Sequence, residues 1–167
     1  RPEEISALIE PLLEGHDVGL LSEAGLPCVA DPGSQVVALA HENDIRIVPL
    51  PGPSSIFLAL MASGFNGQNF TFHGYLPVEK HERVKKIKEL EMMVYQKNQT
   101  QVFIETPYRN QQMMESLISV CKPHTKIWVA TGLTLPGENI RTLSAGQWRK
   151  TGWNDLNKKP AVFLMFC

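Results

Sequence analysis

SEAGLPCVADPGS, residues 22–34, is the stretch of sequence that most restricts the fold. It follows a short apolar run at 18–22, which we expect to form a buried strand, and open α/β sheets bind ligands at the carboxyl ends of their strands. Gly25 and Gly33 allow a ligand to approach the backbone closely. Asp31 as N-cap and Pro32 at the first helical position predict that a helix follows. A tight structural turn would have the same composition, so this loop alone leaves both readings open.

A second segment of the same kind is PLPGPSSIFLALMASG, residues 49–64. The run IRIVPL (45–50) predicts a strand, the Pro-Gly-Pro turn ends it, and a helix follows from the serines. Ser54 and Ser55 could cap this helix or contact a ligand with the same hydroxyl groups, and capping is the commoner role.

Further along the chain, short apolar runs alternate with amphipathic stretches, which predicts an α/β protein. We expect helices at 3–14, 80–97 and from Thr106-Pro107 to about 121, and strands at 69–76, 101–105, 126–131, 139–143 and 161–166. Ser144 and Gln147 predict a capping box. The Gly- and Asn-rich stretch 64–69 is typical of a linker, so we predict two domains, 1–67 and 68–167. Because the first half offers only two strands, we expect it to be truncated at its start.

The composition is that of an ordinary globular protein. The 167 residues carry a formal net charge of −1, so any contact with nucleic acid would need a local basic patch. Cys28, Cys121 and Cys167 lie far apart without metal-ligand spacing, so we expect free thiols and no metal site. No apolar run is long enough to cross a bilayer and no signal peptide opens the chain, so we expect a cytoplasmic protein without a membrane partner.

Together the two Gly/Pro segments resemble the motif pair of the tetrapyrrole (corrin/porphyrin) methylase superfamily, in the form typical of the branch that methylates ribose in small-subunit ribosomal RNA. That branch has S-[DE]-A-G-x-P-x-[IV]-[SA]-D-P-G followed by V-P-L-P-G-P-[SC]. This chain has SEAGLPCVADPG (22–33) and VPLPGPS (48–54). Later landmarks of the branch match as FHGYLP (72–77), FIETPYR (103–109) and, in part, ENIRTL (138–143). The resemblance covers nearly the whole chain.

The resemblance implies two α/β domains of the tetrapyrrole methylase type, with S-adenosyl-L-methionine in a cleft between them, and a homodimer. It implies an S-adenosylmethionine-dependent methyltransferase that acts on a ribose 2′-hydroxyl, so ribosomal RNA or the small ribosomal subunit is the expected partner. Carried over by position, the cofactor contacts would be Ala24, Gly25, Leu26, Val29, Ala30, Asp31, Ser54, Ser55, Ile104, Pro160 and Ala161.

The chain departs from the family pattern in two places. It lacks the family's opening strand with its Gly/Pro-rich loop, and ATGLTL (130–135) stands where the ribose methylases have A-R-E-[LI]-T-K. Two alternatives therefore stay open. One is a tetrapyrrole C-methyltransferase of the precorrin or uroporphyrinogen type, against which the SEAGLP form of the loop argues. The other is a non-catalytic family member that still binds S-adenosylmethionine.

Methyl transfer from a sulfonium depends on the alignment of acceptor, methyl and sulfur, and a hydroxyl acceptor would benefit from a general base. Glu105 is the first candidate for that base because it ends a strand; its alternative role is to cap a helix or pair with Arg109. His73 is the second candidate, and a structural role is its alternative.

The helix expected at 80–97 is rich in basic side chains, which could face RNA or could simply form a solvated helix surface. These side chains are Lys80, Arg83, Lys85, Lys86 and Lys88. The three tryptophans, Trp128, Trp148 and Trp153, are expected in the core or at an interface.

Overall fold

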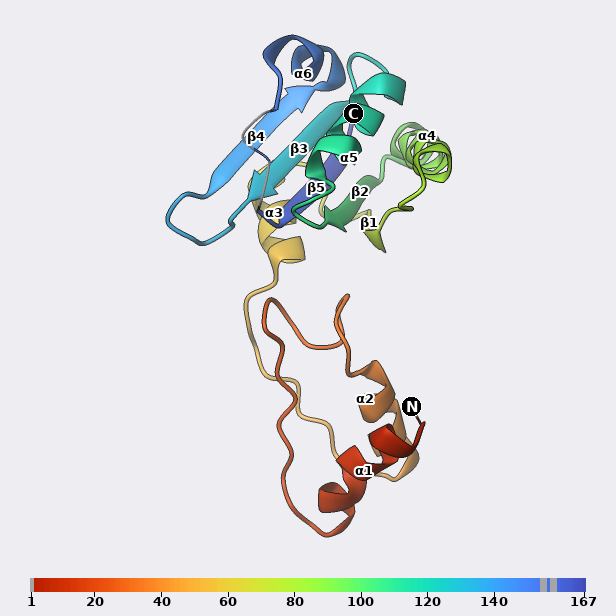
Figure 1. Ribbon diagram of the computed structural model, residues 1–167, viewed down its shortest axis with the longest axis vertical. Helices are drawn as coiled ribbons and strands as arrows, with labels where there is room; N and C mark the ends of the chain where they lie inside the picture. The colour runs from red at the N-terminus through yellow and green to blue at the C-terminus, as the bar shows by residue number, and fades with distance from the viewer. Residues whose placement is uncertain (1, 154–155, 157–158) are drawn as a thin grey trace. The chain divides into compact units, whose positions relative to one another are not determined.

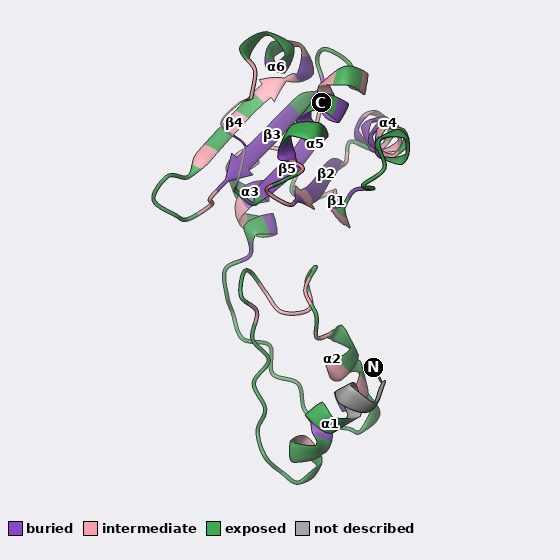
Figure 2. Ribbon diagram, viewed as in Figure 1, coloured by how far each residue is buried: buried purple, intermediate pink, exposed green. Residues whose placement is uncertain are grey.

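The computed structural model describes residues 2–153, 156 and 159–167, and the chain divides into two compact units, residues 1–54 and 55–167. The first unit contains helices α1 (Pro2–Leu13) and α2 (Ser34–Glu42), which pack against each other. Ile9 of α1 and Ala40 of α2 are buried. Long extended segments complete this unit, and most of their residues are exposed (Figure 2).

The two strands predicted in the first unit, at 18–22 and 45–50, are wrong: neither stretch is a strand in the structure. A strand forms only when a neighbouring strand satisfies its backbone hydrogen bonds, and no strand is present in the described part of this unit. The apolar side chains of both stretches consequently face solvent. Leu21 is 89% exposed and Leu50 is 79% exposed.

The start of α2 also differs from the prediction that Asp31 caps it and Pro32 is its first helical residue. The helix begins at Ser34 and its N-cap is Gly33, with a φ of 125° and no side-chain cap. This φ lies outside the helical region and is open to glycine alone at low cost, so the helix cannot extend back through Pro32.

The second unit is α/β, as predicted, and is built on one mixed sheet. Its strands are β1 (Phe70–Tyr75), β2 (Thr100–Glu105), β3 (Lys126–Thr131), β4 (Asn139–Ser144) and β5 (Ala161–Phe166). They lie in the order β1-β2-β5-β3-β4, so β5, the last strand in the chain, occupies the centre (Figure 1). β1 and β2 are parallel, and the other neighbouring pairs are antiparallel. All five predicted strands of this half are confirmed.

Helices cover both faces of the sheet. The helices are α3 (Ser55–Ser63), α4 (Lys80–Lys97), α5 (Asn110–Val120) and α6 (Ala145–Thr151). Side chains of α4, α5 and α6 pack on one face with Phe103, Phe163 and Trp148, and side chains of α3 pack on the other with Trp128. The central strands are therefore buried on both sides: almost every residue of β2, β3 and β5 is buried, including the polar Thr100 and Gln101 at the start of β2.

The helix ends of the second unit agree with the sequence predictions in part. The helix predicted at 80–97 is confirmed as α4, and Ser144 and Gln147 form the predicted capping box. Thr106 and Pro107 do not open α5, because residues 106–109 form a turn and the helix begins at Asn110. The chain divides between Ser54 and Ser55 because α3 packs on the sheet of the second unit; the domain boundary after residue 67 stays a prediction.

Candidate cofactor site

The loop at 22–34 has an unusual backbone. Gly25, Cys28, Ala30 and Gly33 have φ values of 76°, 67°, 55° and 125°. Such conformations in non-glycine residues are strained and concentrate at functional sites. Ser22 braces the entrance to the loop, because its Oγ donates to the Ala24 carbonyl at 2.9 Å and accepts from the Ala24 amide at 3.3 Å. The loop therefore holds a defined shape while much of its backbone remains exposed.

The second Gly/Pro turn lies against this loop. A Cβ built on Gly52 would sit 3.1 Å from Cδ2 of Leu26, so any side chain at this position would press on Leu26. Among the predicted contacts, Ala24, Gly25, Val29, Ala30 and Ser55 are exposed, Leu26 and Asp31 are half-buried, and Ser54 is buried. The first unit thus brings together the loop at 24–31 and the turn that ends at Ser54.

In the second unit the predicted residues gather at one end of the sheet. Glu105 at the end of β2 pairs with Ala161 at the start of β5, and Ala161 pairs in turn with Thr131 at the end of β3. Side chains of residues paired in this way point to the same face of a sheet. Ile104 points to the opposite face, towards α3, and Pro160 is exposed just before β5.

Glu105 is held by an ion pair. Its side chain is only 1% exposed, and Oε1 accepts hydrogen bonds from Arg109 Nε at 2.8 Å and from the Thr106 amide at 2.7 Å. Arg109 Nη2 lies 2.6 Å from the same oxygen. The pairing with Arg109 that we weighed against a catalytic role is confirmed; the role of Glu105 as a base stays a prediction.

Two polar residues at this end of the sheet were not singled out from the sequence. Asn110 donates from Nδ2 to the carbonyls of Leu156 at 2.8 Å and Lys159 at 2.7 Å, and so holds these two residues near the start of β5. Its Oδ1 and the Thr131 Oγ1 are buried without a hydrogen-bond partner among the described residues. Buried polar groups are almost always paired, so these two oxygens are available to a ligand or to water. Neither residue carries a local sequence signal. The pairing register places Thr131 beside Ala161, and Asn110 contacts residues that are distant in sequence.

The second base candidate, His73, has a structural setting. Its Nε2 lies 2.8 Å from Oε1 of Gln101 on the neighbouring strand. Burial lowers the pKa of His73 below its ordinary value, the hydrogen bond to Gln101 opposes this, and the charge of Lys86 adds to the lowering. His73 is therefore a partner of Gln101 within the sheet, on the edge strand β1.

The basic residues of α4 do not act as one group. Arg83 is buried and donates to Ser116 Oγ at 3.0 Å and to the carbonyls of Pro77 and Val78 at 3.3 and 2.6 Å. It ties α4 to α5 and to the preceding loop, so it is not available to RNA. Lys86 forms an ion pair with Glu89 at 3.3 Å. Lys80, Lys85 and Lys88 are exposed.

The tryptophans and cysteines agree with the expectations drawn from sequence. Trp128 and Trp148 are fully buried on opposite faces of the sheet, and Trp148 donates from Nε1 to the Ile127 carbonyl at 3.0 Å. The three cysteines are free thiols. Within the described part of the chain, no cluster of three potential metal ligands occurs. No helix there is both long and apolar enough to span a membrane.

Comparisons with known proteins identify the family. The family model for tetrapyrrole (corrin/porphyrin) methylases matches residues 2–148. "Ribosomal RNA small subunit methyltransferase I" of Vibrio cholerae is 31% identical over 163 residues, which are 98% of this chain and 55% of that protein. The protein of the same name from Mesorhizobium japonicum is 36% identical over 135 residues, 81% of this chain and 45% of that protein. The chain thus spans about half the length of these relatives.

Solved structures agree on the fold. The methyltransferase CobJ superposes with a TM-score of 0.65 at 19% identity, covering 98% of this chain and 70% of that one. The uroporphyrin-III C-methyltransferase of Thermus thermophilus superposes with a TM-score of 0.58 at 20% identity, covering 99% and 67%. The loop pair, the sheet and the family match over residues 2–148 lead to one conclusion: the chain belongs to the tetrapyrrole (corrin/porphyrin) methylase family.

Proposed function

We propose that the protein is an S-adenosylmethionine-dependent methyltransferase that methylates a ribose 2′-hydroxyl of small-subunit ribosomal RNA. The observation that carries the proposal is the identity of 31% over 98% of the chain to a relative named as a small-subunit ribosomal RNA methyltransferase. The sequence motifs support the same branch, because SEAGLPCVADPG and VPLPGPS have its form rather than that of the tetrapyrrole enzymes.

The residues that would hold the cofactor fit a small polar nucleoside. When bound, the cofactor supplies an electrophilic methyl group on a sulfonium. In the first unit, the strained loop at residues 24–31 offers amides and carbonyls, and Ser54 ends the turn that lies against this loop. Ser55 is the first residue of α3 in the second unit and would add its hydroxyl. In the second unit, Ile104, Pro160 and Ala161 would add contacts, and the buried oxygens of Asn110 and Thr131 would accept hydrogen bonds from ligand or water.

Glu105 remains our candidate for the base that receives the ribose proton. Two hydrogen bonds and the ion-pair contact with Arg109 Nη2 all fall on Oε1, so in this proposal Oε2 is the oxygen that would take the proton. Conversion of Glu105 to Gln removes the negative charge and keeps the shape. A base role predicts that Glu105→Gln lowers kcat by about 10²–10⁴-fold with little change in cofactor affinity.

We further propose that the protein works in the cytoplasm as a homodimer. The family resemblance supports the dimer, and the cytoplasm is where a small ribosomal subunit would be met. Sedimentation equilibrium tests the dimer, because a monomer at micromolar concentration would exclude it.

One departure favours a second candidate, a family member that binds S-adenosylmethionine without transferring the methyl group. The segment 130–135 contains no charged residue, and Gly132, with a φ of 62°, opens the turn into β4. If charges at this place hold RNA in the ribose methylases, the protein would bind RNA weakly. A tetrapyrrole acceptor remains a third possibility, which saturable binding of a uroporphyrinogen would support.

Two measurements separate these functions. Calorimetric titration with S-adenosylhomocysteine tests the cofactor, and the absence of heat and of a thermal shift at millimolar ligand would exclude it. Transfer of labelled methyl from S-adenosylmethionine to unmodified small-subunit RNA tests the acceptor. Binding without transfer to RNA or tetrapyrrole would favour the non-catalytic member.

A further inference from the structure

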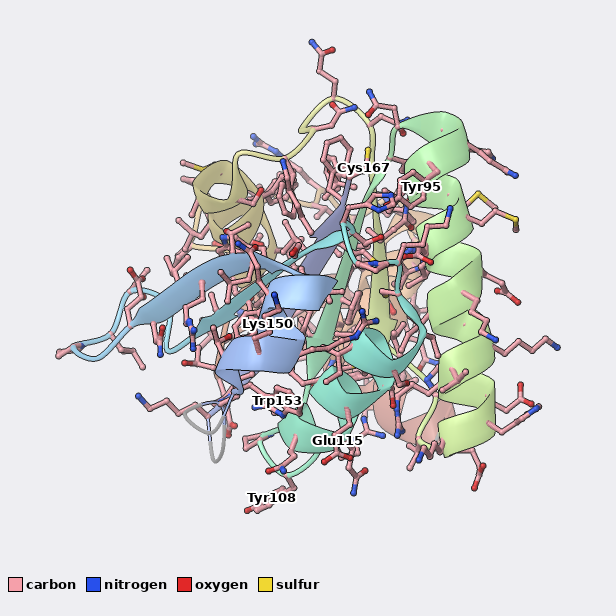
Figure 3. The ribbon with its side chains drawn as sticks, turned by 90° about the horizontal axis from the view of Figure 1, so that it is seen from above. Tyr95, Tyr108, Glu115, Lys150, Trp153 and Cys167 are labelled. Atoms are coloured by element: carbon pink, nitrogen blue, oxygen red, sulfur yellow. The ribbon has the colours of Figure 1, made fainter. Side chains whose placement is uncertain are left out.

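Tyr108 is a large aromatic residue that is almost fully exposed to solvent. It lies between β2 and α5 in the turn formed by residues 106–109, and 90% of its surface is exposed. Figure 3 shows its side chain at the rim of the second unit, pointing outward. Aromatic rings in folded proteins are usually buried to a large extent. Because Tyr108 is 90% exposed, its ring is open to a flat partner.

The turn that carries Tyr108 is held at both ends by one buried carboxylate. Oε1 of Glu105 accepts from the Thr106 amide at the start of the turn and from the Arg109 guanidinium at its end. The Arg109 amide donates to the Thr106 carbonyl at 3.0 Å, which closes the turn. The ring of Pro107 fixes the φ angle of that residue within the turn. The backbone that carries Tyr108 is therefore fixed, so a partner that stacks on the ring orders a side chain and not a loop.

The position of the ring links it to the proposed cofactor contacts. The turn leaves the carboxyl end of β2, directly after Ile104 and Glu105, and Glu105 pairs with Ala161 across the sheet. The turn therefore follows directly on the residues that we propose to contact the cofactor and the acceptor.

We propose that Tyr108 is a stacking platform for a nucleobase of the single-stranded RNA acceptor. The inference rests on the proposed function and names the contact that holds the substrate at the same site. Proteins hold unpaired bases by stacking them on exposed aromatic side chains, and stacking tolerates any base because every base has a flat face. An anionic ligand has less to bind here, because the guanidinium of Arg109, the next residue in the chain, already pairs with Glu105.

Two substitutions isolate the ring. Tyr108→Phe keeps the flat face and removes the hydroxyl, whereas Tyr108→Leu keeps an apolar side chain and removes the ring. Met92→Ala, which removes an exposed apolar side chain on α4, is the matched control. The measurements are fluorescence anisotropy with a single-stranded RNA oligonucleotide of mixed sequence, calorimetry with S-adenosylhomocysteine, and kcat and KM for methyl transfer to unmodified small-subunit RNA.

We expect Tyr108→Leu to weaken RNA binding by roughly 5- to 150-fold, the range for loss of one stacked base. Tyr108→Phe and Met92→Ala should bind RNA nearly as the wild type does, and all variants should bind S-adenosylhomocysteine equally. The increase in KM for RNA should exceed any decrease in kcat.

Several results would overturn the inference. Wild-type RNA affinity in Tyr108→Leu would exclude a stacking role, while wild-type methyl transfer would leave the proposed function standing. Equal losses in the Phe and Leu variants would assign the contact to the hydroxyl. A change in sedimentation that accounts for the lost RNA affinity would make the ring a protein contact. Failure of the wild type to bind S-adenosylhomocysteine or to methylate RNA would remove the proposed function and this inference together.

Discussion

Replacement of Arg109 by Met should destabilise the second unit substantially. The substitution keeps an apolar stem and removes the guanidinium that pairs with Glu105. The Glu105 carboxylate, which is 1% exposed, would then keep the Thr106 amide as its one hydrogen-bond donor among the described residues. A buried charge without its partner is costly because protein replaces the water that would otherwise solvate it.

The size of the effect follows from the burial of the two partners. Removing one member of a fully buried ion pair costs about 3–5 kcal/mol. Arg109 is 19% exposed, so water already reaches part of this pair and would reach more of it in the variant. We therefore expect a loss of about 2–3 kcal/mol, a large share of the roughly 5–15 kcal/mol that stabilises an ordinary domain.

Urea unfolding followed by tryptophan fluorescence measures this loss, because Trp128 and Trp148 are buried in the second unit. At a typical urea dependence, the midpoint should fall by about 1 M. Lys86→Met is the control: its ion pair with Glu89 is solvent-exposed, and the expected change is within about 0.5 kcal/mol. The double variant Glu105→Gln/Arg109→Met should recover part of the loss, since no buried charge remains.

Equal stability of the Arg109→Met and Lys86→Met variants would refute this reasoning. It would mean that the carboxylate is solvated in solution, and the turn that presents Tyr108 would then lose its stated support.

Three further predictions concern other parts of the chain. Gly33→Ala places a Cβ 2.6 Å from Leu20 Cδ2 at a φ of 125°, so it should destabilise the first unit by about 1–3 kcal/mol in urea unfolding followed by circular dichroism; an unchanged midpoint would contradict this. Burial raises the pKa of Cys121 to about 12, so iodoacetamide at pH 8 should label the exposed Cys167 and spare Cys121 until urea is added; equal labelling in the folded protein would contradict it. Burial lowers the pKa of His73 below 6.5, so on acidification the unfolded chain takes up the proton before the folded one, and the free energy of unfolding should fall as pH drops below 6.5. His73→Gln should reduce this pH dependence, and the same pH profile in the wild type and the variant would contradict the prediction.

The second half of the fold was predictable because its signals are local and redundant. Each of β2, β3 and β5 has a short apolar run at its centre and is preceded in the chain by a helix, so pattern alone located them. The order β1-β2-β5-β3-β4 was not predictable, because the insertion of the last strand at the centre depends on contacts distant in sequence. The same register places Thr131 beside Ala161, which is why sequence reasoning missed it.

The first half shows the opposite limit. The stretches 18–22 and 45–50 have the composition of strands, yet strand formation depends on a neighbour that pattern cannot supply. The Asp31-Pro32 signal was overridden by Gly33, whose positive φ delays the helix. The proximity of the two Gly/Pro segments followed from the family motif, and the contact between Gly52 and Leu26 agrees with it.

The most direct test of the account is the transfer of labelled methyl from S-adenosylmethionine to small ribosomal subunits that lack the modification. We expect the labelled methyl group to be recovered in a dinucleotide after alkaline hydrolysis of the RNA, because a methylated 2′-oxygen can no longer attack the adjacent phosphodiester. Label released as a base-methylated mononucleotide, or no incorporation by a protein that binds S-adenosylhomocysteine, would contradict it.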